Sequence, residues 1–389
     1  MTNRRIFEAP ALDDLEMGVI ARISAMKDSL SYVLQDPVRW TGLLARNALA
    51  KAIRGSNSIE GYNVTQDEAI AAIEGEEPMD ERTEAWIAVD GYRQAMTYVL
   101  QLGKDPHFTY SNELLKSLHF MMLSHDLSKW PGRWRAGSIS VIDEESKKVV
   151  YTGPDESLVD GLMQELMESI RRDAHEGEAP HIVSAAMAHL NLVMIHPFRD
   201  GNGRMGRCLQ TLILVRSGVQ APQFCSIEEY LGRNRREYYD VLAHVGQGHW
   251  NPDEDCRIWV RFCLTAHFRQ MLTILRRTKE LQKLWDELEA IAADFGLPGR
   301  MLFALADASW SLRVRNPMYR KNAEVTPAVA SRDLSKLAEL GLLIPKGEKR
   351  GRYYVAGEKL QEVRRRTREP NRTDEDPFAP DSQMRKPGI

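Results

Sequence analysis

The sequence predicts a mainly α-helical protein with one β-hairpin near its middle and a small helix, helix, hairpin module towards its C-terminus. Apolar residues recur at three- and four-residue spacing along most of the chain, which is the spacing of a buried helix face. Residues 138–151 instead hold two short β-prone runs around a polar turn. After about residue 300 the composition changes to short helical stretches followed by two further β-prone runs.

Capping residues predict where the helices begin and end. Thr65 precedes Glu68 at capping-box spacing, and Ser111 precedes an apolar helical pattern. Gly75 follows the last position of another such pattern, where glycine commonly ends a helix. Residues 253–293 form one long helical stretch, so we expect a linker helix between the first part of the chain and the C-terminal module.

Residues 276–360 are predicted to hold this linker and a winged helix-turn-helix, with a helix from Ala328 to Leu340 and a wing from Leu342 to Val355. The module carries the cations Arg332, Lys336, Lys346, Lys349, Arg350 and Arg352. Contact with DNA and a protein-binding or dimer module with a solvated basic face both stay open. Residues 361–389 are rich in charge and proline, so we expect a disordered tail.

Composition limits the classes of function. The 389 residues are 43% hydrophobic, enough for two or three domains, and the net charge of -3 favours neither nucleic acid nor an anionic membrane globally. No apolar run is long enough to span a membrane and no signal peptide begins the chain, so we expect a cytoplasmic protein. The four cysteines form no C-x-x-C pair, and neither structural zinc nor a disulfide framework is indicated.

Residues 195–207, IHPFRDGNGRMGR, carry the residue types of a nucleotide site. Pro197 must end the preceding helix, so His196 stands at a helix terminus, where a neutral imidazole could accept a proton from an attacking hydroxyl. Asp200 supplies a hard oxygen ligand of the kind that Mg²⁺ prefers beside phosphate oxygens.

The second half of this segment is predicted to bind phosphate. Gly201 and Gly203 are expected to take positive φ and to turn backbone N–H groups towards an anion at the start of the next helix. Asn202 could donate a hydrogen bond to the phosphate under attack. Arg204 and Arg207, three residues apart, would direct their guanidinium groups to the outer phosphates.

Two other interpretations explain the same segment less well. GNGRMG matches the dinucleotide-binding pattern G-x-G-x-x-G, but no series of parallel strands surrounds it and no acidic residue follows at the required distance. A purely structural capping loop would explain Gly203 or His196 singly. It would not require His, Asp, Asn and two Arg around one anion site.

The segment HPFRDGNGRMGR resembles the Fic (filamentation induced by cAMP) family signature H-P-F-x-[DE]-G-N-G-R-x-x-R at every defined position. The resemblance implies a helical catalytic core, here residues 106–275, with a β-hairpin flap. It implies that His196 is the catalytic base and Asp200 the magnesium ligand. The residues implied to bind the phosphates of ATP are Gly201, Asn202, Gly203, Arg204 and Arg207.

Weaker likenesses lie outside the signature. PGRWRAGSISVI resembles the family's flap, which aligns a target segment by strand addition, and its edge would be Ile139, Ser140, Val141 and Ile142. Only Pro154 follows, where the family often has two prolines. Tyr238 and Tyr239 resemble tyrosines near the adenine pocket, and ordinary aromatic packing of a helix is the alternative.

Upstream, GSNSIEG matches the family's inhibitory pattern [ST]-x-x-x-E-[GN] with Ser56, Glu60 and Gly61. Ser56 and Glu60 would lie one turn apart at a helix end, from which the carboxylate can reach Arg207 and occupy the space of the γ-phosphate. The resemblance therefore implies inhibition in cis by a helix within an N-terminal helical region, residues 1–105. A solvated surface charge is the alternative for Glu60 alone.

The resemblance implies a protein adenylyltransferase, which moves AMP from ATP onto a hydroxyl side chain of a target protein or of itself. Removal of AMP by the same site is an alternative within the family. A DNA-binding transcriptional regulator with a vestigial core is an alternative from another class. The target, the acceptor residue type and self-association into a homodimer stay open.

Overall fold

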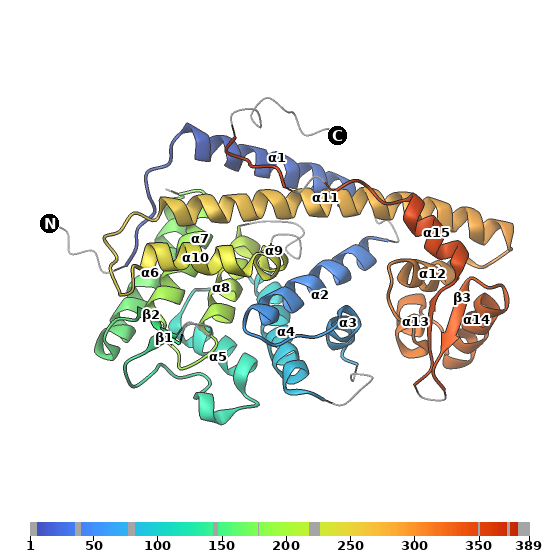
Figure 1. The fold of residues 1–389 in the computed structure, drawn as a ribbon, viewed down its shortest axis with the longest axis horizontal. Coiled ribbons are helices and arrows are strands. Elements are labelled where there is room, and N and C mark those ends of the chain that lie inside the picture. The colour runs from blue at the N-terminus through green and yellow to red at the C-terminus, as the bar shows by residue number, and fades with distance from the viewer. Residues whose placement is uncertain are drawn as a thin grey trace.

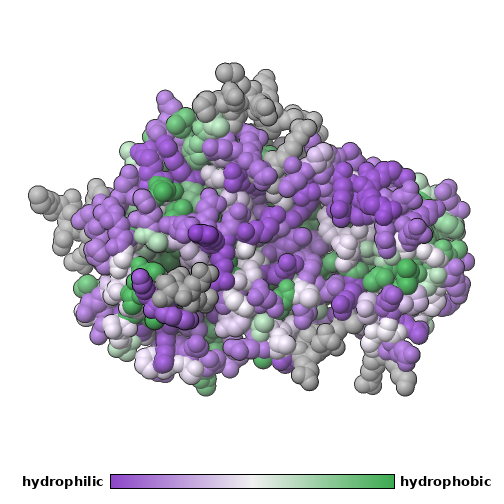
Figure 2. Space-filling model, in the orientation of Figure 1, coloured by the Kyte–Doolittle hydropathy of each residue, from purple (hydrophilic) through white to green (hydrophobic). Residues whose placement is uncertain are grey.

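The structure is a computed structural model, and its fold is mainly helical with two small antiparallel sheets (Figure 1). The predicted fold class is confirmed. On the face shown in Figure 2, hydrophilic side chains cover most of the surface and hydrophobic ones form small scattered groups. No helix among the described residues is long and apolar enough to cross a membrane. The described residues are 6–35, 40–76, 82–142, 147–177, 179–217, 226–348, 351–371 and 374–379.

The first part of the chain folds around two central helices, α7 and α8, most of whose residues are buried. Thr65 and Glu68 form the predicted capping box, and Ser111 caps the helix that follows it. The helices and strands of this first part are α1 (Asp14–Gln35), α2 (Thr41–Ile59), α3 (Gln66–Glu74), α4 (Glu84–Leu102), α5 (Asn112–Leu123), β1 (Ser140–Ile142), β2 (Val149–Thr152), α6 (Val159–Glu176), α7 (His181–Ile195), α8 (Asn202–Arg216), α9 (Glu228–Arg233) and α10 (Arg235–Gly246).

One long helix, α11 (Arg257–Asp294), joins this part to the C-terminal module (Figure 1). Its 38 residues span about 57 Å, and it packs against α1, α7 and α10 before it reaches the module. We use "C-terminal module" for residues 295–366, in which three helices precede a hairpin; the last two helices and the hairpin follow the predicted order. The elements are α12 (Leu302–Ser309), α13 (Asn316–Ala323), α14 (Pro327–Glu339), β3 (Leu343–Lys346), β4 (Tyr353–Ala356) and α15 (Glu358–Arg366).

The prediction of a disordered tail from residue 361 is wrong for the tail's first part. α15 continues to Arg366, Val363 is buried, and Arg364 donates to Glu280 of α11 at 2.8 Å. Further along, the carboxylate of Glu375 lies 2.7 Å from a guanidinium of α1. The tail is held largely by charged side chains, which a search for apolar clusters does not detect. Residues 380–389 of this prediction lie outside the described residues.

Candidate active site

His196 sits where α7 ends. Pro197 cannot continue the helix, and His196 takes a left-handed conformation with φ 52° while its N–H still donates to the oxygen of Leu192 at 3.0 Å. Its Nδ1 lies 3.1 Å from the carbonyl oxygen of Val193, so Nδ1 carries the proton and Nε2 keeps a free lone pair. Burial lowers the pKa of His196, so the ring is neutral near pH 7.

Arg135 braces this turn, although the sequence did not single it out as a site residue. Its Nε donates to the carbonyl oxygen of His196 at 2.9 Å, and its own N–H donates to the carbonyl of Pro197 at 2.8 Å. The guanidinium also donates to the carbonyls of Gly137 and Pro154, which flank the flap hairpin. One buried arginine thus fixes the histidine backbone and both ends of the flap together.

His119 is a second residue that holds the loop and that sequence reasoning missed. Its Nε2 donates to the carbonyl oxygen of Asp200 at 3.0 Å, its Nδ1 accepts the N–H of Gly132 at 2.9 Å, and its ring stacks on Phe198. Burial lowers its pKa to about 4. A single histidine on a helix face gives no signal in the sequence that separates this role from ordinary packing.

Asp200 and Gly201 form the turn before α8. One carboxylate oxygen of Asp200 accepts the N–H of Gly201 at 2.6 Å, and the other lies 3.1 Å from Nζ of Lys129. Burial would raise the pKa of Asp200, but the hydrogen bond and charge of Lys129 lower it overall, so the group is ionised. Gly201 has φ 76°, which confirms its predicted positive φ.

The predictions for Gly203 and Asn202 were wrong in their geometry. Gly203 lies in the first turn of α8, outside the set of glycines with positive φ. Its role is to leave room, because a Cβ there would lie 2.4 Å from Oε1 of Glu60 and would force that flexible side chain to move. The side-chain amide of Asn202 bonds both the N–H and the carbonyl of Phe198 at 2.9 Å. It closes the loop instead of facing an anion.

Arg207 and Glu60 meet as the sequence predicted. A guanidinium nitrogen of Arg207 donates to Oε1 of Glu60 at 2.7 Å, while Nε donates to Oγ of Ser56 at 2.8 Å. Burial alone would lower the pKa of Arg207, but the charge of Glu60 raises it overall. The Glu60 carboxylate therefore lies over the first turn of α8, where unsatisfied backbone N–H groups and the helix dipole favour an anion. Gly61 follows with φ 84°, a left-handed conformation that directs the chain away from α2.

Arg204 is a fully buried cation with unmet hydrogen-bonding capacity. Its Cζ lies 5.2 Å from the ring of Tyr62, and among the described residues its Nε and one terminal nitrogen have no hydrogen-bond partner. A buried, charged donor without a partner is unfavourable and is rare except where a ligand completes the site. Arg204 therefore points to an anion that is bound during function.

The close approach of α2 to α9 depends on glycine. A Cβ on Gly55 would lie 2.4 Å from the carbonyl oxygen of Glu228, and one on Gly232 would lie 2.7 Å from Cα of Gly55. The backbones of α2 and α9 are therefore in direct contact. Behind this contact, burial raises the pKa of Glu228 to about 7, while the hydroxyl of Tyr92 donates to its carboxylate at 2.8 Å.

The predicted flap is a hairpin that is anchored beside the loop. β1 pairs with β2 in antiparallel register, with Val141 opposite Tyr151, and Ile139 immediately precedes the strand. The hydroxyl of Tyr151 donates to the carbonyl of Met194 at 2.7 Å, which ties the hairpin to the end of α7. Ile142 is exposed, and Ser140 pairs with Thr152.

The two tyrosines of α10 differ in their surroundings. Tyr238 is buried and its hydroxyl lies 3.1 Å from Nε2 of His189, so the packing interpretation describes it well. Tyr239 is partly exposed, and its hydroxyl lies 3.4 Å from the carbonyl of Ile59, beside the turn that carries Glu60. Both tyrosines therefore border the site, because Tyr239 lies beside the turn of Glu60 and Tyr238 lies close to the guanidinium of Arg207.

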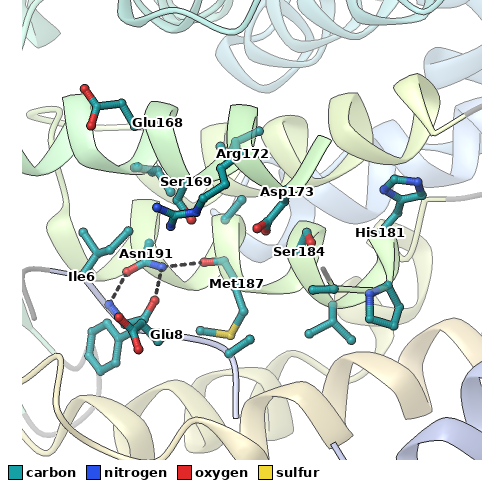
Figure 3. A pocket seen from close by; sticks show the side chains of 18 of the residues that line it. Ile6, Glu8, Glu168, Ser169, Arg172, Asp173, His181, Ser184, Met187 and Asn191 are labelled. Atoms are coloured by element: carbon teal, nitrogen blue, oxygen red, sulfur yellow. Dashed lines mark hydrogen bonds between the residues drawn. The ribbon is translucent and has the colours of Figure 1, made fainter. Parts of the chain in front are cut away.

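A separate cavity of about 1370 Å³ lies between residues 6–12 and the helices α6 and α7 (Figure 3). The side-chain amide of Asn191 bonds the N–H and carbonyl of Phe7 at 2.9 Å, which pins the N-terminal segment over α7 (Figure 3). None of the residues that line this cavity belongs to the loop from His196 to Arg207. The candidate site and this cavity are distinct.

Comparison with known proteins agrees with this geometry. The Fic/DOC family model matches residues 109–214, which include the flap, α7, the loop and most of α8. Over these residues the chain is similar to the Fic/DOC family. In solved structures, a Fic family protein of Desulfovibrio desulfuricans superposes with a TM-score of 0.57 at 19% identity, over 90% of this chain and 99% of that one. A Fic-1 structure from C. elegans gives a TM-score of 0.52 at 20% identity, over 68% and 73%.

Two curated relatives of this chain are named protein adenylyltransferases. A protein adenylyltransferase Fic of Nematostella vectensis is 26% identical over 302 residues, which cover 72% of this chain and 63% of the relative. One from Aedes aegypti is 26% identical over 278 residues, covering 70% and 51%. The chain thus spans roughly half to two thirds of the length of these two relatives.

Proposed function

We propose that the chain transfers AMP from ATP to a hydroxyl group of a protein, and that Glu60 holds this activity back. The observation that carries the proposal is the meeting of a neutral His196, an ionised Asp200 and two buried arginines at the first turn of α8. The names of the curated relatives support the same reaction class. The unpartnered nitrogens of Arg204 fit a phosphate-bearing substrate.

In the proposed reaction the acceptor hydroxyl attacks the α-phosphorus of ATP. A new oxygen–phosphorus bond forms, the bond to the bridging oxygen breaks, and pyrophosphate leaves. The hydroxyl proton passes to Nε2 of His196, whose Nδ1 stays bound to the carbonyl of Val193 and keeps the ring oriented. The N–H groups of the first turn of α8, together with Arg204, stabilise the charge that develops on the phosphates. The β1 edge would align the target backbone.

A magnesium ion fits this site through Asp200. The carboxylate already attracts a cation, Nζ of Lys129, and Mg²⁺ prefers one or two carboxylates with phosphate oxygens and water. When bound, the ion would neutralise phosphate charge. The described residues contain no group of three or more His, Cys, Asp and Glu that could hold a metal, so phosphate and water must complete its coordination.

Inhibition follows from the position of the Glu60 carboxylate. The carboxylate lies beside Gly203 and accepts a hydrogen bond from the guanidinium of Arg207, which a phosphate would otherwise accept. A negative charge there also repels the triphosphate. We therefore propose that ATP binds productively only when Glu60 turns away.

Incubation with ATP labelled at the α-phosphate tests the proposal. We expect little self-labelling by the wild type, strong labelling by Glu60→Gly, and at least a hundredfold loss when His196→Ala is added, because the general base is removed. Glu60→Gln is the matched control, since it keeps the size of the side chain and removes its charge. Absence of label with Glu60→Gly, on itself and on lysate proteins, would contradict the proposal. Release of AMP from a modified target by the wild type alone would favour removal of AMP instead.

We also propose that the C-terminal module is a winged helix that contacts DNA. Residues 295–366 contain fifteen Lys and Arg against seven Asp and Glu, although the whole chain has a net charge of -3. Arg332 and Lys336 are exposed on α14, the helix in the recognition position. Lys349 and Arg350 of the predicted wing lie outside the described residues. Binding to genomic fragments that weakens steeply between two salt concentrations, and that Arg332→Glu with Lys336→Glu abolishes, is the expected result. Binding unaffected by these changes would indicate a protein-contact module.

A further inference from the structure

The turn that carries Glu60 covers both arginines of α8. Residues 60–65 join α2 to α3, and within them Glu60 binds Arg207 while Tyr62 lies over Arg204. A triphosphate that reaches both guanidinium groups must displace this turn. The position of the turn is set by the two helices that it joins, so whatever fixes those helices also fixes Glu60.

The helix before the turn is held at two points. Its middle is in backbone contact with α9 through Gly55 and Gly232. Near its start, Arg46 forms an ion pair with Asp307, a buried residue of α12 in the C-terminal module. The body of α2 is therefore fixed in place.

The helix after the turn is held by the C-terminal module through a set of ion pairs. Three acidic residues on or beside α3 pair with three basic residues on or beside α13. The backbone N–H of Arg313 donates to one carboxylate oxygen of Asp67 at 2.9 Å, and its side-chain Nε lies 3.3 Å from the other oxygen. The partners in the other two pairs are Arg315 with Glu76, and Lys321 with Glu74 at 2.7 Å.

We propose that these three ion pairs form a clasp by which the C-terminal module holds the turn of residues 60–65, and with it Glu60, over the anion site. This inference rests on the proposed inhibition by Glu60. Partly exposed ion pairs are individually weak and are screened by salt, so the clasp can open without unfolding either part. A ligand of the module that separates α13 from α3 would then act as an activator, because it biases an equilibrium that also controls nucleotide access.

The test reverses the three basic charges in the full chain, as Arg313→Glu with Arg315→Glu and Lys321→Glu. Hydrogen exchange of residues 57–66 and the initial rate of self-labelling from α-labelled ATP are both measured. We expect faster exchange in this segment and about a tenfold higher rate. The matched control reverses three exposed cations of the same region that take no part in the clasp, Arg320, Arg365 and Arg368, and should change neither quantity.

A charge swap separates loss of the clasp from loss of folding. For the double variant Arg313→Glu with Arg315→Glu, adding Asp67→Lys and Glu76→Lys should restore slow exchange and a low rate, because both pairs re-form with opposite polarity; Glu74 stays unchanged because it also lies 3.6 Å from Arg46. Unchanged exchange of residues 57–66 in the triple variant would overturn the clasp, whatever the catalytic result. If Glu60→Gly shows no labelling, the proposed function fails, and the exchange measurement still decides whether the clasp exists.

Discussion

The first turns of α8 and the C-terminal module are both rich in arginine, but they use it in opposite ways. Arg204 and Arg207 are fully buried, and hydrogen bonds to Ser56 and Glu60 hold the guanidinium of Arg207. Arg320 and Arg332 of the module are exposed to water. Buried cations fix the geometry of a site, because a change of partner leaves an unmet charge in the interior. Exposed cations can exchange partners at little cost, which suits a reversible contact.

Acidification should separate the two regions most strongly. Burial lowers the pKa of His189 to about 3 and of His119 to about 4, whereas residues 295–366 contain no histidine. Because the folded pKa lies below the unfolded value of about 6.5, stability is complete above that pH and is lost as pH falls. We expect each group to remove about 2 kcal/mol by pH 5. Urea denaturation at about pH 7.5 and at about pH 5 measures this loss in the free energy of unfolding. His189→Asn should flatten the dependence, and equal midpoints would contradict the assignment.

Removal of one arginine from each region should give unequal losses of stability. Arg207→Ala strips Ser56 and Glu60 of their shared donor and should cost about 3 kcal/mol. Arg332→Ala should change the free energy of unfolding by less than about 0.5 kcal/mol. Thermal unfolding compares the two, with Arg207→Lys as the variant that keeps the charge but cannot make both hydrogen bonds. Similar losses for both alanine variants would show that burial does not distinguish the regions.

A smaller effect is expected at Gly203 and depends on Glu60. Gly203→Ala would place a methyl group 2.4 Å from Oε1 of Glu60, so it should displace that side chain from Arg207 and destabilise the wild type by about 1 kcal/mol or less. In a Glu60→Gly background the clash is gone, and alanine should be neutral or slightly stabilising within the helix. A double-mutant cycle measured by denaturation gives the coupling. A coupling of zero would mean that the carboxylate does not lie over this residue in solution.

Much of the fold and of the loop could be predicted because local rules govern them. Helical spacing, the capping box at Thr65 and the break at Pro197 act within a few residues of sequence. The contact between Glu60 and Arg207 was predicted only because a family pattern supplied it, since 147 residues separate the two.

The errors came where tertiary contacts decide. Nothing in the sequence places Arg135 or His119 behind the loop, and the need for glycine at 203 comes from a side chain of a distant helix. The tail from residue 361 was expected to be disordered because its sequence lacks apolar clusters, and its contacts are made largely by charged side chains. Composition alone cannot show which charges find partners across the molecule.

The backbone contact between α2 and α9 has a consequence for the speed of switching. With no side chain between Gly55 and Glu228, sliding the whole helix away would expose two bare backbone surfaces to water at once. Movement of one glutamate side chain with its short connecting turn requires no such separation. Such local motions take nanoseconds to microseconds, whereas movements of whole helices extend to milliseconds. Once the clasp is open, Glu60 can therefore leave the anion site without any movement of α2.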